Sequence, residues 1–190
     1  MLLSAQSLVQ SADFYILDFL QTMARSSFWD RFFAMFTSFG DPVMIICYCA
    51  LLVVVPKTRR DGIMVTCGAL AGLAVGNGLL KYLIRRDRPC WIRPEVELLV
   101  KNPTDYSFPS GHTMHFAILS VILIYNHPKL AYALIPVSLL MAYSRMYLYV
   151  HFPSDVLGGL ILGIGIGLLT CRLFPKAEKK FSGRKALPEN

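Results

Sequence analysis

The amino-acid sequence predicts an all-α fold, a polytopic membrane helix bundle with about six transmembrane helices. Composition is the first observation: hydrophobic residues make up 55% of the 190 residues and charged residues 16%, with a mean hydropathy of +0.50. The second is that uncharged segments recur between short polar links. Only the run at 62–80 approaches the ~20 residues that a lone spanning helix needs. The shorter runs therefore need the shielding that a compact bundle provides.

Six segments are expected to span the membrane, in the order 28–39, 42–56, 62–84, 112–126, 130–149 and 153–174. The first is the weakest, because it is short and carries Asp30 and Arg31. The stretch before it is amphipathic and is expected to lie along the membrane surface. The chain accordingly divides into an N-terminal interfacial segment (1–27), a membrane domain (28–174) and a basic cytoplasmic tail (175–190).

Basic residues in the short links indicate the orientation. The link "PKTRRD", the link "NHPK" and the C-terminal tail alternate correctly to share one side, which the positive-inside rule makes cytoplasmic. If the segment 28–39 spans, both termini lie on that side. The net charge of +7 then reflects membrane orientation, and no nucleic-acid partner is expected. The polar ends of the remaining spans gather at the opposite, extracytoplasmic face.

Six basic residues lie in the outer segment 81–111, which is against the positive-inside expectation and indicates a local task for them. They are Lys81, Arg85, Arg86, Arg88, Arg93 and Lys101. Guanidinium forks and a helix N-terminus both favour a phosphate group. The stretch "SFPSGH" supplies that terminus, with Ser110 as a capping hydroxyl and Gly111 allowing close backbone approach. The sequence therefore predicts a phosphate-binding site.

Two histidines fall at the same face, at the mouths of neighbouring spans. In "HFPSD", Pro153 suits the first turn of the last helix and leaves Asp155 able to reach back to His151. A carboxylate on one imidazole nitrogen raises the nucleophilicity of the other. His151 is therefore a candidate nucleophile, and His112 is a candidate general acid.

Three other interpretations of these residues are a metal site, a carrier of anionic lipids and a structural subunit. His112 and His115 are three residues apart, but no acidic cluster has ligand-like spacing and the basic residues repel a cation, so no metal and no cofactor are expected. A non-catalytic carrier or binding protein for anionic lipids needs the basic residues but no nucleophile. A structural membrane subunit needs neither.

Three motifs together resemble the signature of the type 2 phosphatidic acid phosphatase superfamily, over roughly residues 40–174. They are K-x6-R-P (Lys81, Arg88, Pro89), P-S-G-H (Pro109, Ser110, Gly111, His112) and S-R-x5-H-x3-D (Ser144, Arg145, His151, Asp155). The resemblance implies a metal-independent phosphatase with a six-helix membrane core. Its soluble vanadium haloperoxidase branch does not fit a chain with this many apolar spans.

The resemblance also implies the roles of individual residues. Those that bind the phosphoryl group would be Lys81, Arg88, Ser110, Gly111 and Arg145. His151, oriented by Asp155, would form a phospho-histidine intermediate, and His112 would protonate the leaving oxygen. These roles coincide with those inferred above from charge and placement.

The expected substrate is an amphiphile, because the site opens beside apolar helices. The resemblance suggests undecaprenyl diphosphate, phosphatidylglycerol phosphate or phosphatidic acid, in a bacterial cytoplasmic membrane. Stripes of glycine in two spans allow close helix contact or a homodimer: Gly68, Gly72 and Gly76 in one, and Gly159, Gly163 and Gly167 in the other.

Overall fold

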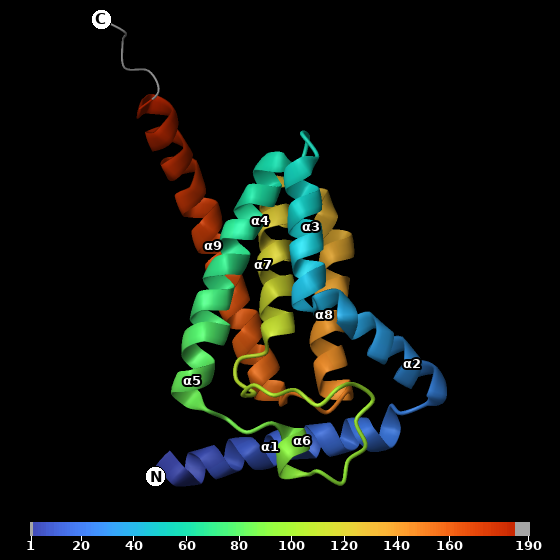
Figure 1. Ribbon diagram of the computed structural model, residues 1–190. Coiled ribbons are helices and arrows are strands. Elements are labelled where there is room, and N and C mark those ends of the chain that lie inside the picture. The colour runs from blue at the N-terminus through green and yellow to red at the C-terminus, as the bar shows by residue number, and fades with distance from the viewer. Residues whose placement is uncertain (1, 185–190) are drawn as a thin grey trace, which may run out of the picture.

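The computed structural model describes residues 2–184, with side chains described for residues 8–178. All regular elements in this part of the chain are helical, so the predicted all-α class is confirmed (Figure 1). The α-helices are α1 (Leu2–Met23), α2 (Ser27–Phe36), α3 (Pro42–Val54), α4 (Arg59–Gly72), α5 (Lys81–Ile84), α6 (Pro89–Ile92), α7 (Gly111–Asn126), α8 (Ala131–Tyr147) and α9 (Pro153–Arg184). Two 3-10 turns, η1 (Thr37–Gly40) and η3 (Pro128–Leu130), and a π-helical stretch, η2 (Leu73–Leu80), complete the set.

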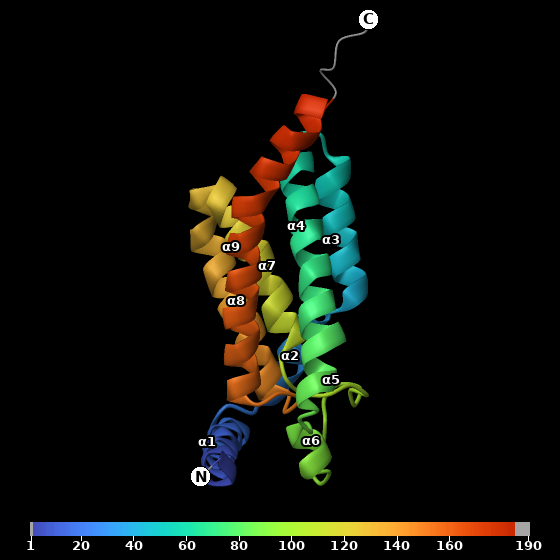
Figure 2. The same ribbon diagram turned by 90° about the vertical axis from the view of Figure 1, so that its left-hand side faces the viewer.

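The bundle is formed by α3, the rod α4–η2–α5, α7, α8 and α9, which run side by side (Figures 1 and 2). Helix α7 packs against α4, α8 and α9. Its side chains Met114, Ile118 and Ile122 have no exposed surface. This central position explains how a helix of only 16 residues is accommodated: its neighbours shield it from lipid.

Two helical segments are long and apolar enough to cross a membrane by themselves, Arg59–Ile92 and Pro153–Glu178. The pair Ser27–Gly40 and Pro42–Val54 adds a third if it is one broken span, because the two parts are bent by 56° at the break. The other helices of the bundle are shorter, as expected from the short uncharged runs.

The N-terminal segment does not cross the bundle. Helix α1 lies across the end of the bundle that also holds the loop between α5 and α7, whereas the C-terminal part of α9 is at the other end (Figure 1). Helix α2 has 10 residues, or about 15 Å of length, and bends into α3, so it does not carry the chain from one end to the other. The prediction that both termini lie on one side required the segment 28–39 to span the membrane, and α2 does not span it.

Helix α9 continues past residue 174 to Arg184, so the segment predicted as a basic tail begins inside this helix. Residues 185–190 of that segment lie outside the described residues. The links α3–α4 and α7–α8 and the far part of α9 lie at one end of the bundle, opposite α1 (Figure 1). The three basic segments thus share one end, as the alternation of the spans predicts.

Both glycine stripes face α7 and do not face each other. A Cβ atom at Gly72 would lie 2.7 Å from Ile118 Cδ1, and one at Gly163 would lie 2.4 Å from the Met114 carbonyl oxygen. At Gly163 the contact is with a backbone oxygen, so only glycine allows α9 to approach α7 this closely. At Gly72 the nearest atom is the end of a flexible side chain, so the stripe on α4 favours close packing less strictly. The stripes therefore hold the helix that leads into Lys81 and the helix that begins near Asp155 on two sides of one central helix.

Candidate active site

Two helix N-termini meet at the end of the bundle near α1. The backbone N–H of Ser110, just before α7, donates to the carbonyl oxygen of Asp155 in the first turn of α9, at 3.1 Å. A Cβ atom at Gly159 would lie 2.5 Å from the Ser110 carbonyl oxygen, so glycine is required for this approach. The stretch "SFPSGH" and the stretch "HFPSD" are thereby brought side by side.

The start of α9 is fixed by its own sequence. Pro153 is the first residue of the helix, as predicted, and Asp155 is the third. Asp155 Oδ2 accepts a hydrogen bond from the backbone N–H of Phe152 at 2.9 Å, the reciprocal contact of a capping box. Asp155 has no exposed surface. This local contact holds the carboxylate beside His151.

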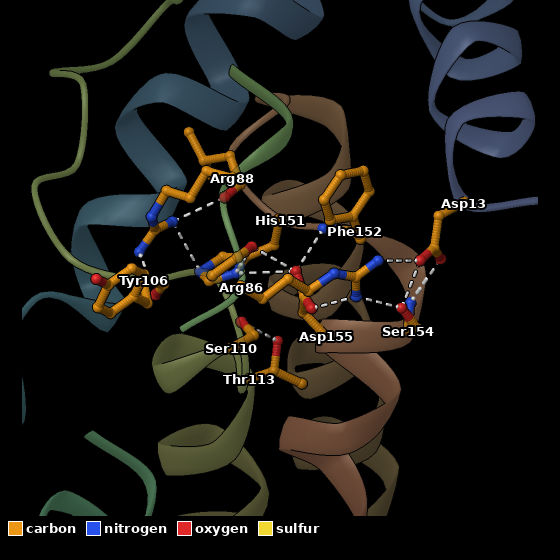
Figure 3. A network of polar contacts seen from close by, with 12 residues as sticks. Asp13, Arg86, Arg88, Tyr106, Ser110, Thr113, His151, Phe152, Ser154 and Asp155 are labelled. Carbon is orange, nitrogen blue, oxygen red and sulfur yellow. Dashed lines mark hydrogen bonds and ion pairs between the residues drawn. The ribbon is translucent and has the colours of Figure 1, made fainter. Parts of the chain in front are cut away.

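Ser107 lies between the carboxylate and the imidazole (Figure 3 shows the surrounding network). Its hydroxyl donates to Asp155 Oδ2 at 2.5 Å and is 3.4 Å from His151 Nδ1, whereas Nδ1 and Oδ2 are 3.7 Å apart. The contact from Asp155 to His151 is therefore shared with a serine that sequence reasoning missed. Its only signal was its place at the start of "SFPSGH".

The other imidazole nitrogen of His151 faces a cation. Nε2 lies 3.1 Å from Nη1 of Arg88, and because a guanidinium only donates, Nε2 is the acceptor. Burial first, and then the charges of Arg88 and Arg145, lower the pKa of His151 well below its ordinary value. His151 is thus a neutral imidazole with a lone pair on Nε2, as a nucleophile requires.

A cavity of about 1240 Å³ opens in front of this nitrogen. Six of the eight predicted site residues line it: Lys81, Arg88, Gly111, His112, Arg145 and His151. The cavity then continues along apolar side chains of α3, α4 and the start of η2, among them Ile45, Cys49, Val53, Ala69, Leu70 and Leu73. One end is therefore cationic and the other apolar.

Lys81 and Arg88 form a cationic cradle that holds a carboxylate from the loop before α7. Arg88 donates from Nη2 to Asp105 Oδ1 at 2.6 Å and from Nε to the Asp105 carbonyl oxygen at 2.7 Å, and Lys81 pairs with Oδ2. Burial alone would raise the pKa of Asp105, but the two cations outweigh it and lower the pKa to about 2. This aspartate belongs to the segment 81–111 that the sequence predicts at the outer face, but sequence reasoning assigned it no contact.

Arg145 and His112 approach the cavity with partners from the N-terminal part of the chain. Arg145 is 6% exposed, and its guanidinium donates to the hydroxyl of Thr37 in η1, while its Nε has no partner among the described residues. His112 Nε2 lies 3.3 Å from Oδ1 of Asp41, the residue before α3. The segment around 37–41 therefore closes the site, although its sequence carries no signature motif.

The two remaining predicted residues, Ser110 and Asp155, lie behind the cavity wall. The Ser110 hydroxyl has no exposed surface and pairs with the Thr113 hydroxyl at 3.0 Å, so in this structure it does not face the cavity. Gly111 does face the cavity. A Cβ atom there would lie 3.2 Å from Oδ1 of Asn77 in η2, a buried oxygen with no partner among the described residues.

His115 is held by the helix bundle. Its Nδ1 donates to the Gly111 carbonyl oxygen at 2.8 Å, which leaves Nε2 3.3 Å from the carbonyl oxygen of Ala69 in α4. Within residues 8–178, no group of three His, Cys, Asp or Glu side chains is placed to hold a metal ion.

Known proteins share this sequence pattern and this fold. The PAP2 superfamily model matches residues 62–179. An undecaprenyl-diphosphatase of Sulfolobus acidocaldarius is 33% identical over 138 residues, which is 72% of this chain and 66% of the relative. Undecaprenyl-diphosphatase BcrC of Bacillus subtilis is 29% identical, over 67% of this chain and 68% of the relative. The chain thus spans about two thirds of the length of these curated relatives.

A solved structure extends the likeness over most of the fold. The crystal structure of a transmembrane PAP2 type phosphatidylglycerolphosphate phosphatase from Bacillus subtilis matches with a TM-score of 0.69 and 29% identity. The match covers 89% of this chain and 87% of that one. The helical arrangement is therefore that of a known membrane phosphatase.

Proposed function

The chain belongs to the PAP2 superfamily, in its branch of membrane lipid phosphate phosphatases, and from this premise we propose that it removes a phosphate group from a lipid phosphate or diphosphate. Members of this branch are metal-independent hydrolases. One observation carries the proposal: a neutral, buried His151 faces a cradle of basic side chains at the end of an apolar cavity. A phosphoryl group fits the cradle, and the imidazole is its nucleophile.

The reaction has two steps. Nε2 of His151 forms a bond to phosphorus while the bond from phosphorus to the leaving oxygen breaks, and His112 gives that oxygen a proton. A water molecule then gives a proton to His112 and attacks phosphorus while the bond from phosphorus to Nε2 breaks, which releases inorganic phosphate and restores both histidines. Lys81, Arg88 and Arg145 stabilise the negative charge on the phosphoryl oxygens in both steps. The N-terminus of α7 adds its backbone N–H groups and dipole.

The lipid tail is proposed to occupy the apolar part of the cavity. Its walls come from α3 and α4, and the cationic end holds the headgroup. A pocket with this division suits an amphiphile and suits a soluble phosphate ester less well. The related proteins named above are undecaprenyl-diphosphatases and a phosphatidylglycerolphosphate phosphatase, so an undecaprenyl diphosphate is the first substrate to test and phosphatidylglycerol phosphate the second.

The site is proposed to face the extracytoplasmic side of a bacterial cytoplasmic membrane. The basic links between helices lie at the other end of the bundle, where the positive-inside rule places the cytoplasm. Membrane lipids are the expected surroundings. Because both glycine stripes are covered by α7, a homodimer would have to use a different face.

Phosphate release tests the function directly. The purified full chain in detergent is incubated with undecaprenyl diphosphate, phosphatidylglycerol phosphate and phosphatidic acid, and inorganic phosphate is measured. His151→Ala is the control. A carrier of anionic lipids would bind these lipids and release no phosphate, and that result would exclude the enzyme.

A further inference from the structure

We propose that Asp13 of the N-terminal helix α1 is a positioning residue for the pair Asp155 and His151, acting through the guanidinium of Arg86. The proposal rests on the function given above, in which His151 is the nucleophile. Helix α1 lies outside the bundle and before every signature motif, yet one of its side chains reaches the start of α9 (Figure 3). Nothing in the family signature assigns a role to this helix.

The Asp155 carboxylate is held from both of its oxygens. Oδ2 accepts from Ser107 and from the backbone of Phe152, and Oδ1 accepts from Arg86 Nη1 at 2.6 Å. A carboxylate without exposed surface is costly unless such donors compensate it. Arg86 is the only one of these donors that carries a charge. The charge on Asp155 that His151 experiences therefore depends on Arg86.

Arg86 itself is fixed from three sides. Its Nη2 donates to Asp13 Oδ2 at 2.6 Å, and its Nη1 donates to the Ser154 hydroxyl at 2.6 Å as well as to Asp155. The guanidinium carbon lies 4.1 Å from the centre of the Phe152 ring. A guanidinium with two carboxylates and a ring face has little rotational freedom, so its position follows from the position of Asp13.

Asp13 is built into this site and is not a surface residue. It is 4% exposed. Its Oδ1 accepts from the backbone N–H of Ser154 at 3.0 Å and its Oδ2 accepts from the Ser154 hydroxyl at 2.5 Å. A carboxylate on an N–H group in the first turn of α9 is also stabilised by the helix dipole. Asp13 thus fixes both Arg86 and the turn that carries Asp155.

The charges explain why a second carboxylate matters. Arg86 alone would neutralise Asp155 and weaken its pull on the Nδ1 proton of His151. With Asp13 present, one positive charge is shared between two negative ones, and Asp155 keeps a net negative potential at the imidazole. A more negative partner on Nδ1 makes Nε2 the better nucleophile. Asp13 is expected to act on the chemical step and not on lipid binding.

A simpler interpretation is that Asp13 only docks α1 onto the bundle. The chain offers a matched control for it, because Asp18 on the same helix also pairs with an arginine. Arg93 Nη1 lies 2.7 and 2.8 Å from the two oxygens of Asp18, and its guanidinium stacks 4.1 Å from the Phe14 ring. This pair has no contact with Asp155. Asp18→Asn therefore removes the same charge from the same helix, at a more exposed ion pair, and takes no hydrogen bond away from Arg86, Ser154 or Asp155.

The experiment compares Asp13→Asn, Asp13→Glu and Asp18→Asn in the full-length protein, by phosphate release from the preferred lipid. For Asp13→Asn we expect kcat to fall on the order of 10- to 100-fold, as for a misplaced catalytic group, with KM within about twofold of the wild type. Asp13→Glu keeps the charge and restores part of the loss. Asp18→Asn keeps the wild-type kcat. Equal losses in Asp13→Asn and Asp18→Asn would overturn the proposal, as would an unchanged kcat in Asp13→Asn.

A second readout does not depend on turnover. Diethyl pyrocarbonate modifies the neutral imidazole, and the rate at His151 is followed by mass spectrometry with the half-exposed His127 as internal reference. Asp13→Asn is expected to slow the modification of His151 several-fold and to leave His127 unchanged. If the wild type releases no phosphate from any lipid, the proposed function fails, and this rate still decides the role of Asp13: an unchanged rate at His151 rejects it. If Asp13→Asn does not accumulate as folded protein, Asp13→Glu against Asp18→Glu gives the same comparison.

Discussion

Asp105 is bound to Arg88 as a phosphoryl group would be. The guanidinium donates to the carboxylate at 2.6 Å and to the carbonyl oxygen of the same residue at 2.7 Å, and Lys81 pairs with the second carboxylate oxygen. An acidic side chain of the protein thus holds the donors that the proposed mechanism assigns to substrate. The side chain is 46% exposed, so it is able to leave the cradle when an anion arrives.

Replacing this carboxylate is expected to strengthen anion binding. In Asp105→Asn the cradle has no competing negative charge, so inorganic phosphate should inhibit turnover several-fold more strongly than in the wild type. Glu97→Gln is the matched control, because this exposed acid lies in the same loop and the structure records no contact of its carboxylate with the cradle. The measurement is the phosphate inhibition constant of the three proteins. Weaker inhibition in Asp105→Asn would mean that Asp105 holds the cradle in shape.

Asp105 also predicts a pH dependence of stability. Its pKa is about 2 in the folded protein, and about 3.9 is normal for the unfolded chain. A lowered pKa contributes stability that is complete above about pH 4 and is lost as the pH falls towards 2. The difference in unfolding temperature between wild type and Asp105→Asn should therefore be constant from pH 7 to 5 and shrink below pH 4. If the difference in unfolding temperature is already lost at a pH above 5, a group other than Asp105 is responsible for the pH dependence.

The two histidines are expected to differ in their dependence on the leaving group. His151→Ala removes the nucleophile and should abolish turnover of every substrate. His112→Ala should cost roughly 10²- to 10⁴-fold for an alkyl phosphate, the usual range for general acid catalysis. The cost should be much smaller for an aryl phosphate, whose leaving oxygen needs no proton. Turnover of both ester types by both variants checks this, and rescue of His151→Ala by the aryl ester would reverse the two roles.

Turnover is expected to continue in excess chelator and to be inhibited by vanadate. Lys81, Arg88 and Arg145 line the cavity. In the proposed mechanism their charges face the phosphoryl oxygens and take the place of a metal ion in stabilising the five-coordinate state that vanadate resembles. The assay is phosphate release with and without EDTA, followed by addition of a divalent ion. Loss of activity that the ion restores would contradict the metal-free mechanism.

Alanine substitutions are expected to affect stability differently at Gly163, which belongs to the glycine stripe of α9, and at Gly165, which does not. A Cβ atom at Gly163 would lie 2.4 Å from a backbone oxygen of α7, whereas one at Gly165 has nothing within 4 Å. Gly163→Ala should lose about 1–3 kcal/mol through overpacking, and Gly165→Ala should be unchanged or slightly more stable. Unfolding temperatures in detergent test the pair. Equal stability of the two variants would show that α9 does not pack on α7 at this point.

Sequence reasoning predicted the helices that build the site, and most of the residues that it named line the cavity. Helix α9 begins at Pro153 as expected, and six of the eight predicted site residues face one cavity. These features depend on properties of residues that are neighbours in the sequence: hydrophobic runs, the alternation of basic links, and the preference of proline for a first helical turn. Because such properties can be recognised in the sequence, the helices and their polar ends could be predicted from it.

The contacts that complete the site are not local. Asp13 and Ser154 are 141 residues apart, Arg145 and Thr37 are 108 apart, and Ser107 reaches Asp155 across 48. No periodicity relates such positions, because each contact depends on how far a helix is rotated about its axis and how closely it packs. The glycines that set that closeness were visible in the sequence, but the side chains opposite them were not. The sequence by itself therefore determined the class of chemistry and the end of the bundle where it occurs, and the packing of helices around α7 decided which acids, hydroxyls and cations surround His151.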